Sequence, residues 1–236
     1  MFDTPRNSQY DRDTELYNRL VDELYYDKYP NGVTLTPEYA DFVENNLLRL
    51  LIRLARYKFV ARMLRPRDSV LEIGSGSGVG TMFLSQHCAR AIGIDVKQHE
   101  VNESRAINRR ENVSFEVADF FEFPRERRFD AVVALDVIEH MPIEVGARLI
   151  EKAGQHLNPG GMVVIGTPSV YVREYQSALS KASHVKMYDQ DELVELMERY
   201  FHRVLPFSMN DEVVHTGMPK MAWYYFMLAL QPRDAA

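Results

Sequence analysis

A strand-like run that leads directly into a glycine-rich loop constrains this chain more than any other feature. Val70–Ile73 is apolar except for Glu72, and the loop that follows has alternating glycines at positions 74, 76, 78 and 80. Because glycine has no Cβ, the backbone of such a loop can approach a ligand closely before it enters a helix. We therefore expect a nucleotide-like ligand at the carboxyl end of this strand.

Strand-like runs alternate with helical stretches from residue 69 onward. The runs expected to form strands are Ser69–Ile73, Arg90–Ile94, Val113–Val117, Phe129–Leu135 and Gly161–Gly166. Helices are expected over Met141–Leu157 and from a capping box at Asp189 and Glu192 to about Tyr200. This alternation predicts βαβ units, and therefore an α/β fold with a doubly wound, mostly parallel sheet.

The last two strand-like runs complete the expected sheet. Phe201–Phe207 and Met221–Leu230 are separated by a polar loop, so we expect them to pair as an antiparallel edge. The sheet would then have seven strands, of which the last is antiparallel. The aromatic residues 223–226 are expected to pack this strand against the helices.

The N-terminal region is expected to lie outside the sheet. Residues 1–35 are polar and rich in tyrosine, and Asp13 could cap a short helix that runs to about residue 25. Thr36, as a capping hydroxyl, and Pro37 indicate a helix start, and apolar residues at helical spacing predict one long helix over roughly 37–64. We expect residues 1–64 to form a helical flap over the site and residues 65–236 to form the core.

Composition argues against several classes of function. Lysine and arginine total 28 against 34 acidic residues, so the net charge of −6 offers no general attraction to nucleic acid or to anionic membranes. Cys88 is the only cysteine, which fits a reducing cytoplasm, and no apolar run has the length of a membrane span. We expect a cytoplasmic protein without nucleic-acid or membrane partners. A homodimer is also compatible with the sequence.

The spacing of the glycines separates two kinds of nucleotide cofactor. A dinucleotide loop has the pattern G-x-G-x-x-G, but Val79 or Thr81 takes the third glycine position, depending on the starting glycine. Asp95 ends the next strand, where its carboxylate can accept hydrogen bonds from both ribose hydroxyls. A nicotinamide-dependent oxidoreductase would share the fold and Asp95, but it needs the missing glycine where pyrophosphate approaches the helix.

Five segments, taken in order, resemble one known superfamily. They are VLEIGSGSG, GID, VADFFEFP, FDAVVALDVIEHM and LNPGG, and the match covers roughly residues 58–207. This ensemble resembles the seven-stranded S-adenosylmethionine-dependent methyltransferases. Within it, VIEH and a later histidine resemble the ubiquinone-biosynthesis O-methyltransferase group and its relatives in polysaccharide and natural-product pathways. The resemblance implies S-adenosylmethionine as cofactor and a small-molecule acceptor.

Carried over by position, the resemblance implies a cofactor site along the carboxyl ends of the strands. Glu72 and Gly74 would lie near the methionine amino group, and Asp95 would bind the ribose. Asp119 and Phe120 would meet the adenine. The cofactor-binding set implied in this way is Glu72, Gly74, Ser75, Gly76, Gly78, Asp95, Val96, Asp119, Phe120, Asp136 and Val137.

The long N-terminal helix offers a further contact to the cofactor. Arg53, Tyr57 and Lys58 lie late in that helix, where a cation or a phenol could reach the cofactor carboxylate. We therefore add Tyr57 and Lys58 to the expected cofactor site.

Two histidines are candidate bases. A sulfonium methyl is already activated, so the enzyme must align donor and acceptor and deprotonate the acceptor if it is a hydroxyl. His140 follows the fourth strand, and His184 lies in an insertion at about 167–188 that is expected to bind the acceptor. Asp136, Glu139, His140 and His184 could instead converge on a divalent ion, but no tight metal motif is present, so no metal site is assigned.

These features favour one function and leave two alternatives. The favoured function is S-adenosylmethionine-dependent methylation of a hydroxyl on a small polar metabolite, such as a sugar, a nucleotide-linked sugar or another surface-glycan or natural-product precursor. Oxygen is favoured because histidine bases are available and no N-methylation signature such as N/D-P-P-Y is present. The alternatives are a nicotinamide-dependent oxidoreductase and a non-catalytic module that binds an S-adenosyl ligand.

Overall fold

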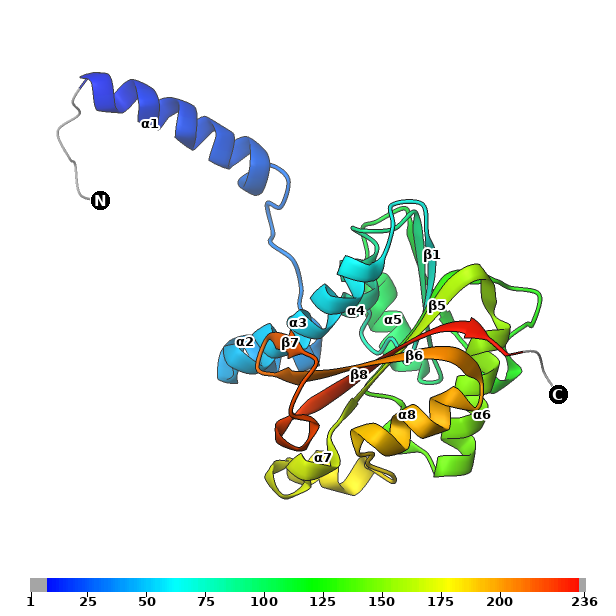
Figure 1. Cartoon of the computed structure of the whole chain (residues 1–236). Helices are drawn as coiled ribbons and strands as arrows, with labels where there is room; N and C mark the ends of the chain where they lie inside the picture. The colour runs from blue at the N-terminus through cyan, green and yellow to red at the C-terminus, as the bar shows by residue number, and fades with distance from the viewer. Residues whose placement is uncertain (1–7, 234–236) are drawn as a thin grey trace. The chain divides into compact units, whose positions relative to one another are not determined.

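The computed structural model describes residues 8–233 (Figure 1). The chain divides into a unit that ends at Leu35 and a larger unit that begins at Thr36. The first unit contains α1 (Ser8–Val21) and a π-helical turn, η1 (Asp22–Tyr26). The larger unit contains the sheet and all the residues expected to bind ligands.

One mixed sheet forms the framework of the larger unit. Its order is β3-β2-β1-β4-β5-β8-β6-β7, which makes eight strands in the described part of the chain. The strands are β1 (Ser69–Ile73), β2 (Arg90–Asp95), β3 (Val113–Val117), β4 (Phe129–Leu135), β5 (Leu157–Pro168), β6 (Phe201–Asn210), β7 (Val213–His215) and β8 (Tyr224–Pro232). β1 to β5 are parallel, whereas β8 runs antiparallel to both β5 and β6. The predicted α/β fold with a mostly parallel sheet is confirmed.

The C-terminal strands differ from the prediction in number and position. The two predicted runs do pair antiparallel, as β6 and β8. The additional strand, β7, arises in the loop between them and pairs with the end of β6, so β7 is the edge and β8 lies inside the sheet. Trp223 does not pack the sheet as predicted: it precedes the first residue of β8 and is 54% exposed, while the next three aromatic side chains are buried.

Helices cover both faces of the sheet. One face carries α3 (Leu47–Met63), α4 (Val79–Leu84) and α5 (Gln98–Ile107), and the other carries α6 (Ile143–Gln155) and α8 (Gln190–Glu198) (Figure 1). Successive side chains of β4 alternate between the two resulting cores, as Val132 and Val133 illustrate, because neighbouring residues of a strand point to opposite faces. Among residues 8–233, no helix is both long enough and apolar enough to cross a membrane.

The long helix predicted over 37–64 is in fact two helices. α2 (Pro37–Asn45) stops at Asn46, whose backbone (φ −156°, ψ 70°) is not helical. The Asn46 side chain accepts a hydrogen bond from the Arg49 backbone N–H at 3.0 Å and so caps α3, a role that asparagine performs well. Pro37 takes the first helical position as predicted, but the Thr36 hydroxyl makes no capping bond.

Two other helix boundaries also differ from the predictions. α1 begins at Ser8, so Asp13 lies within the helix and not at its cap. The helix predicted over 141–157 is α6, which begins after Pro142 and ends at Gln155, because residue 157 already belongs to β5. A separate 3-10 turn, η3 (Ile138–His140), precedes it. The cap at Asp189 is confirmed, since its side chain accepts a hydrogen bond from the Glu192 backbone N–H at 2.8 Å.

Candidate cofactor and acceptor site

The glycine loop after β1 is held in a conformation that glycine alone adopts easily. Gly74, Gly76 and Gly78 have φ values of 70°, 50° and 84°. The backbone N–H groups of Gly74 and Ser75 both donate to the Ile94 carbonyl, at 2.9 and 3.0 Å, which ties the loop to β2. The loop is thus a preformed turn between β1 and α4, at the carboxyl edge of the sheet.

Asp95 fixes the other side of this loop. Its carboxylate accepts hydrogen bonds from the backbone N–H of Gly76, at 3.0 Å, and of Lys97, at 2.9 Å. Each carboxylate oxygen can accept a second bond, so capacity for ribose hydroxyls is left. Val96 follows and is 65% exposed, which leaves an apolar surface beside the loop.

Glu72 lies beneath the loop and is buried. Its Oε2 accepts a hydrogen bond from the Thr81 hydroxyl at 2.5 Å, and the Tyr57 hydroxyl is a further hydrogen-bonding partner. Burial raises the pKa of Glu72 to about 7, although the hydrogen bonds from Thr81 and Tyr57 oppose this shift. The structure therefore makes Glu72 and Tyr57 links between α3, β1 and α4. Lys58, in contrast, is exposed on α3.

Glu72 should make the stability of the protein depend on pH. Its folded-state pKa of about 7 exceeds the ordinary value of 4.5, so the folded chain holds the proton more tightly than the unfolded chain. The stabilisation is present below pH 4.5 and is lost as the pH rises through 7, a change of about 3 kcal/mol. Glu72→Gln should remove this component. Urea unfolding at pH 5 and pH 7.5 would measure it, and an equal pH dependence in variant and wild type would contradict it.

The side chain of Asp119 is exposed, whereas that of the next residue, Phe120, is buried. Asp119 ends the loop after β3, and its side chain accepts a hydrogen bond from the Phe121 backbone N–H at 2.8 Å. The Phe120 ring is buried in the core below α6, beside His156, and does not face the cofactor edge. Only the backbone of Phe120 is therefore available to an adenine.

Asp136 is held by a residue that sequence analysis missed. It has a φ of 57°, which is unusual for a residue other than glycine, and its carboxylate forms an ion pair with Arg56 at 2.5 Å. The Arg56 guanidinium lies 4.0 Å from the centroid of the Tyr224 ring. Arg56 lies three residues after Arg53, one helical turn along α3, and that spacing could have identified it. Val137, the next residue, lies against Gly74.

The structure brings His140 and His184 together. Their rings are 5.1 Å apart between centroids and lie edge to face at 72°. His140 Nδ1 is 3.0 Å from the Ser183 carbonyl oxygen, and His184 Nδ1 is 2.9 Å from Gln176 Nε2. Burial, and then the neighbouring His140, lower the pKa of His184.

Glu139 lies beneath this pair and is fully buried. Its Oε2 accepts a hydrogen bond from the Thr167 hydroxyl at 3.1 Å, whereas its Oε1 has no partner among the described residues. Burial, followed by the charge of Asp136, raises the pKa of Glu139 to about 8. Donor atoms of Glu139, His140 and His184 lie within 4.8 Å of one another and could hold a metal ion. Asp136, the fourth ligand considered, is paired with Arg56 instead.

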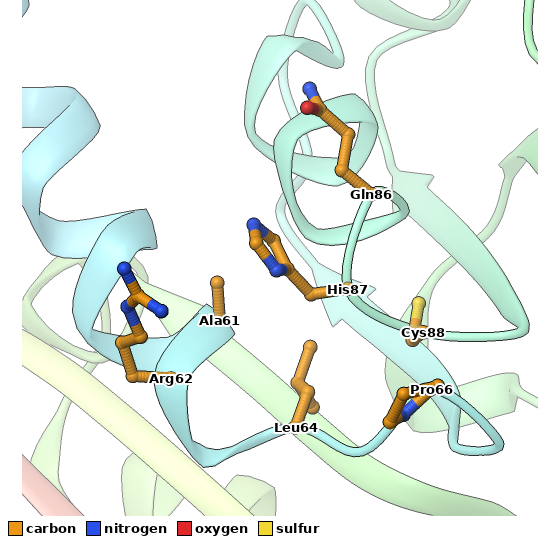
Figure 2. Close-up of a pocket in the computed structure, with 7 residues that line it drawn as sticks. All are labelled: Ala61, Arg62, Leu64, Pro66, Gln86, His87 and Cys88. Atoms are coloured by element: carbon orange, nitrogen blue, oxygen red, sulfur yellow. The ribbon is translucent and has the colours of Figure 1, made fainter.

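A separate cavity lies near the amino ends of β1 and β2 (Figure 2). It has a volume of about 280 Å³ and is lined by Ala61, Arg62, Leu64, Pro66, Gln86, His87 and Cys88. Burial raises the pKa of the Cys88 thiol to about 11, so the thiol stays protonated and is a poor nucleophile. No residue expected to bind cofactor or acceptor lines this cavity.

The comparison with protein families decides between the cofactors. A family described as "Methyltransferase domain" matches residues 39–200. The chain belongs to this methyltransferase family. S-adenosylmethionine is its cofactor, in agreement with the prediction. Membership of this family does not fit the alternative function, that of a nicotinamide-dependent oxidoreductase.

Individual relatives of this methyltransferase domain act on different atoms. A ubiquinone biosynthesis O-methyltransferase of Azorhizobium caulinodans is 30% identical over 161 residues, which are 64% of this chain and 58% of the relative. A phosphoethanolamine N-methyltransferase of Plasmodium falciparum is 33% identical over 106 residues, 43% of this chain and 40% of the relative. The match therefore spans less than two thirds of either relative, and the names include both oxygen and nitrogen acceptors.

A solved structure with the same fold contains the demethylated cofactor. It is the N-methyltransferase NodS from Bradyrhizobium japonicum in complex with S-adenosyl-L-homocysteine, with a TM-score of 0.57 and 18% identity. The alignment covers 78% of this chain and 88% of that chain. At this identity the likeness concerns the fold.

Proposed function

We propose that this domain transfers the methyl group of S-adenosylmethionine to a hydroxyl of a small polar metabolite, such as a sugar or a nucleotide-linked sugar. The observation that carries the proposal is the hydrogen bond between His140 Nδ1 and the Ser183 carbonyl. Because a carbonyl oxygen only accepts, the proton of the neutral imidazole is on Nδ1, and Nε2 presents a lone pair. An imidazole in this state can accept a hydroxyl proton.

The proposed reaction is a single displacement. The acceptor oxygen attacks the methyl carbon opposite to sulfur, the new C–O bond forms as the C–S bond breaks, and S-adenosylhomocysteine leaves. The hydroxyl proton passes to His140 Nε2. The domain contributes alignment and a proton acceptor, since the sulfonium is already activated. A hydroxyl needs this base more than a neutral amine does, because the amine already presents its lone pair, and this difference supports oxygen as the methylated atom.

His184 is assigned a positioning role. An amide N–H can only donate, so Gln176 Nε2 donates to His184 Nδ1, and the proton of the neutral ring is on Nε2. His184 therefore offers no free lone pair in this arrangement. Its lowered pKa keeps the His184 ring neutral, so no positive charge on His184 opposes the protonation of His140.

The cofactor is proposed to bind along the loops after β1, β2 and β3. Its methionine end would lie at the glycine loop above Glu72, its ribose at Asp95, and its adenine between Val96 and the backbone around Asp119. The free hydrogen-bonding capacity of Asp95 and the exposed side chain of Val96 support this arrangement. A helical flap over the site, formed by residues 1–64, and a homodimer stay predictions from the sequence.

Asp95→Ala should weaken binding of S-adenosylhomocysteine by about 1–3 kcal/mol, because the ribose hydroxyls and the Gly76 N–H lose a charged acceptor. Titration calorimetry would measure the change. Lys97→Ala is the matched control, since Lys97 contacts Asp95 through its backbone N–H and its side chain is exposed. Unchanged affinity in Asp95→Ala would remove Asp95 from the site.

A metal-assisted reaction is the second candidate. It is favoured by the unpartnered Oε1 of Glu139 together with the convergence of Glu139, His140 and His184. A divalent ion there would orient the acceptor and lower the pKa of its hydroxyl, so His140 would act as a ligand and not as the base. Loss of turnover in a chelator, restored by magnesium or manganese, would favour this candidate over the first.

The experiment that tests the proposed function is an acceptor panel. Purified protein, treated with chelator, is given S-adenosylmethionine and matched pairs of sugars that carry either a hydroxyl or an amine at one position, and release of S-adenosylhomocysteine is measured. We expect the hydroxyl member of at least one pair to be turned over, whether or not its amine counterpart is a substrate. Turnover restricted to the amine members would contradict it.

A further inference from the structure

The insertion between β5 and α8 borders an open surface cavity next to the histidine pair, and the charged side chains that line it are exposed. Its volume is about 400 Å³, and it is lined by Arg173, Glu174, Gln176, Lys181, His184 and Met187. The insertion contains a 3-10 segment, η4 (Val170–Tyr175), and α7 (Ala178–Ser183), which lies at one end of the sheet in Figure 1. His184 belongs to the wall of this cavity and also contacts the His140 ring, so the cavity adjoins the proposed base.

Two cations of this cavity, Arg173 and Lys181, form no ion pair with the residues that the structure describes. Among the side chains that the structure describes, no carboxylate lies within 4.0 Å of Arg173 or Lys181. Lys186, in the same insertion, is by contrast paired with Glu192. Glu174 also lines the cavity, so its two cations and one carboxylate leave a net positive charge there, whereas the chain as a whole carries a net charge of −6.

One of these cations is also positioned by the backbone. Lys181 Nζ donates a hydrogen bond to the Glu174 carbonyl oxygen at 2.8 Å, which connects α7 to the preceding 3-10 segment. An ammonium has three N–H donors, so two remain for a ligand. The Arg173 guanidinium adds a planar set of donors suited to a carboxylate or a phosphate. Met187 is buried and gives the cavity an apolar part.

We propose that the methyl acceptor carries an anionic group, a carboxylate or a phosphate, which Arg173 and Lys181 bind in this cavity. The proposal rests on the function proposed above, because it places the anionic end of the acceptor beside His184 and leaves a hydroxyl of the same molecule to reach His140. Charge-assisted hydrogen bonds of this kind are stronger than neutral ones, so the anion would contribute much of the acceptor's affinity.

The test uses one sugar in three charge states: glucose, glucose 6-phosphate and glucuronate, with inorganic phosphate as a fourth ligand. Calorimetry measures their binding to the protein saturated with S-adenosylhomocysteine, and the release of S-adenosylhomocysteine from S-adenosylmethionine measures turnover. The variants are Arg173→Gln and Lys181→Gln, and Lys186→Gln is the matched control.

The expected result is that an anionic ligand binds more tightly than glucose and that each of the two variants weakens it about tenfold, while Lys186→Gln does not. The phosphate and carboxylate arms show which anion is preferred. Binding of glucose that equals that of both anionic sugars, or anion binding unchanged in both variants, overturns the proposal. Tight anion binding that depends on Arg173 and Lys181, without turnover of any hydroxyl acceptor, supports this cavity and contradicts only the proposed hydroxyl methylation.

Discussion

Replacing His140 with alanine is expected to lower kcat by about 10²–10⁴-fold and to leave the affinity for S-adenosylhomocysteine nearly unchanged. The imidazole accepts its proton only as the methyl group moves, so its loss acts on the transition state and not on cofactor binding. The Ser183 carbonyl holds the ring with Nε2 unprotonated. Steady-state kinetics and calorimetry on the same preparation would separate the two effects.

Two further variants make the His140 result specific. His140→Gln retains hydrogen bonding without a basic nitrogen and should be as impaired as His140→Ala, whereas His184→Ala should lose only about tenfold, as expected for a residue that positions another. Wild-type turnover in His140→Ala would remove the base from the mechanism. If cofactor affinity falls with kcat, the substitution has disturbed the cofactor site and His140 is not assigned a catalytic role.

Gly78→Ala is expected to destabilise the protein by about 2–5 kcal/mol. The residue has a φ of 84°, which costs an L-residue about 1–2 kcal/mol. A Cβ there would also lie 2.6 Å from the Phe115 ring and overlap Ser104, and overpacking of this kind costs about 1–3 kcal/mol. Urea unfolding at fixed pH would measure the loss, and S-adenosylhomocysteine affinity should fall with it because the loop must move.

Gly160→Ala is the matched control for this prediction. Gly160 has a similar φ of 77°, but no atom lies within 4 Å of the position that its Cβ would take. Its substitution should therefore cost only the backbone strain, about 1–2 kcal/mol. Equal destabilisation by the two substitutions would show that contacts with α5 and β3 do not constrain the cofactor loop.

The five parallel strands could be predicted because their signals are local. Each strand is a short apolar run and each connection carries a helical pattern, so βαβ units follow from the residues themselves. The break at Asn46 could not be predicted in this way, since the apolar spacing continues through it and only the capping bond to Arg49 reveals it. β7 was also missed, because three residues in a polar loop form a strand only when the end of β6 is available to pair with them.

The candidate site shows the same division between local and long-range information. The glycine loop and Asp95 are recognisable from sequence spacing, and the structure places them in direct contact. The pairing of Arg56 with Asp136 joins residues that are 80 positions apart, so it depends on how α3 packs against the sheet. The orientation of the Phe120 ring into the core likewise follows from packing around His156 and not from the local motif.

The atom that receives the methyl group distinguishes hydroxyl methylation from amine methylation. The acceptor that gives the highest turnover in the panel is incubated with S-adenosylmethionine labelled with a deuterated methyl group, and the product is analysed by mass spectrometry and NMR. We expect a labelled methyl ether on a hydroxyl oxygen, formed in the presence of chelator and strongly reduced in His140→Ala. A labelled methyl group on nitrogen would contradict it.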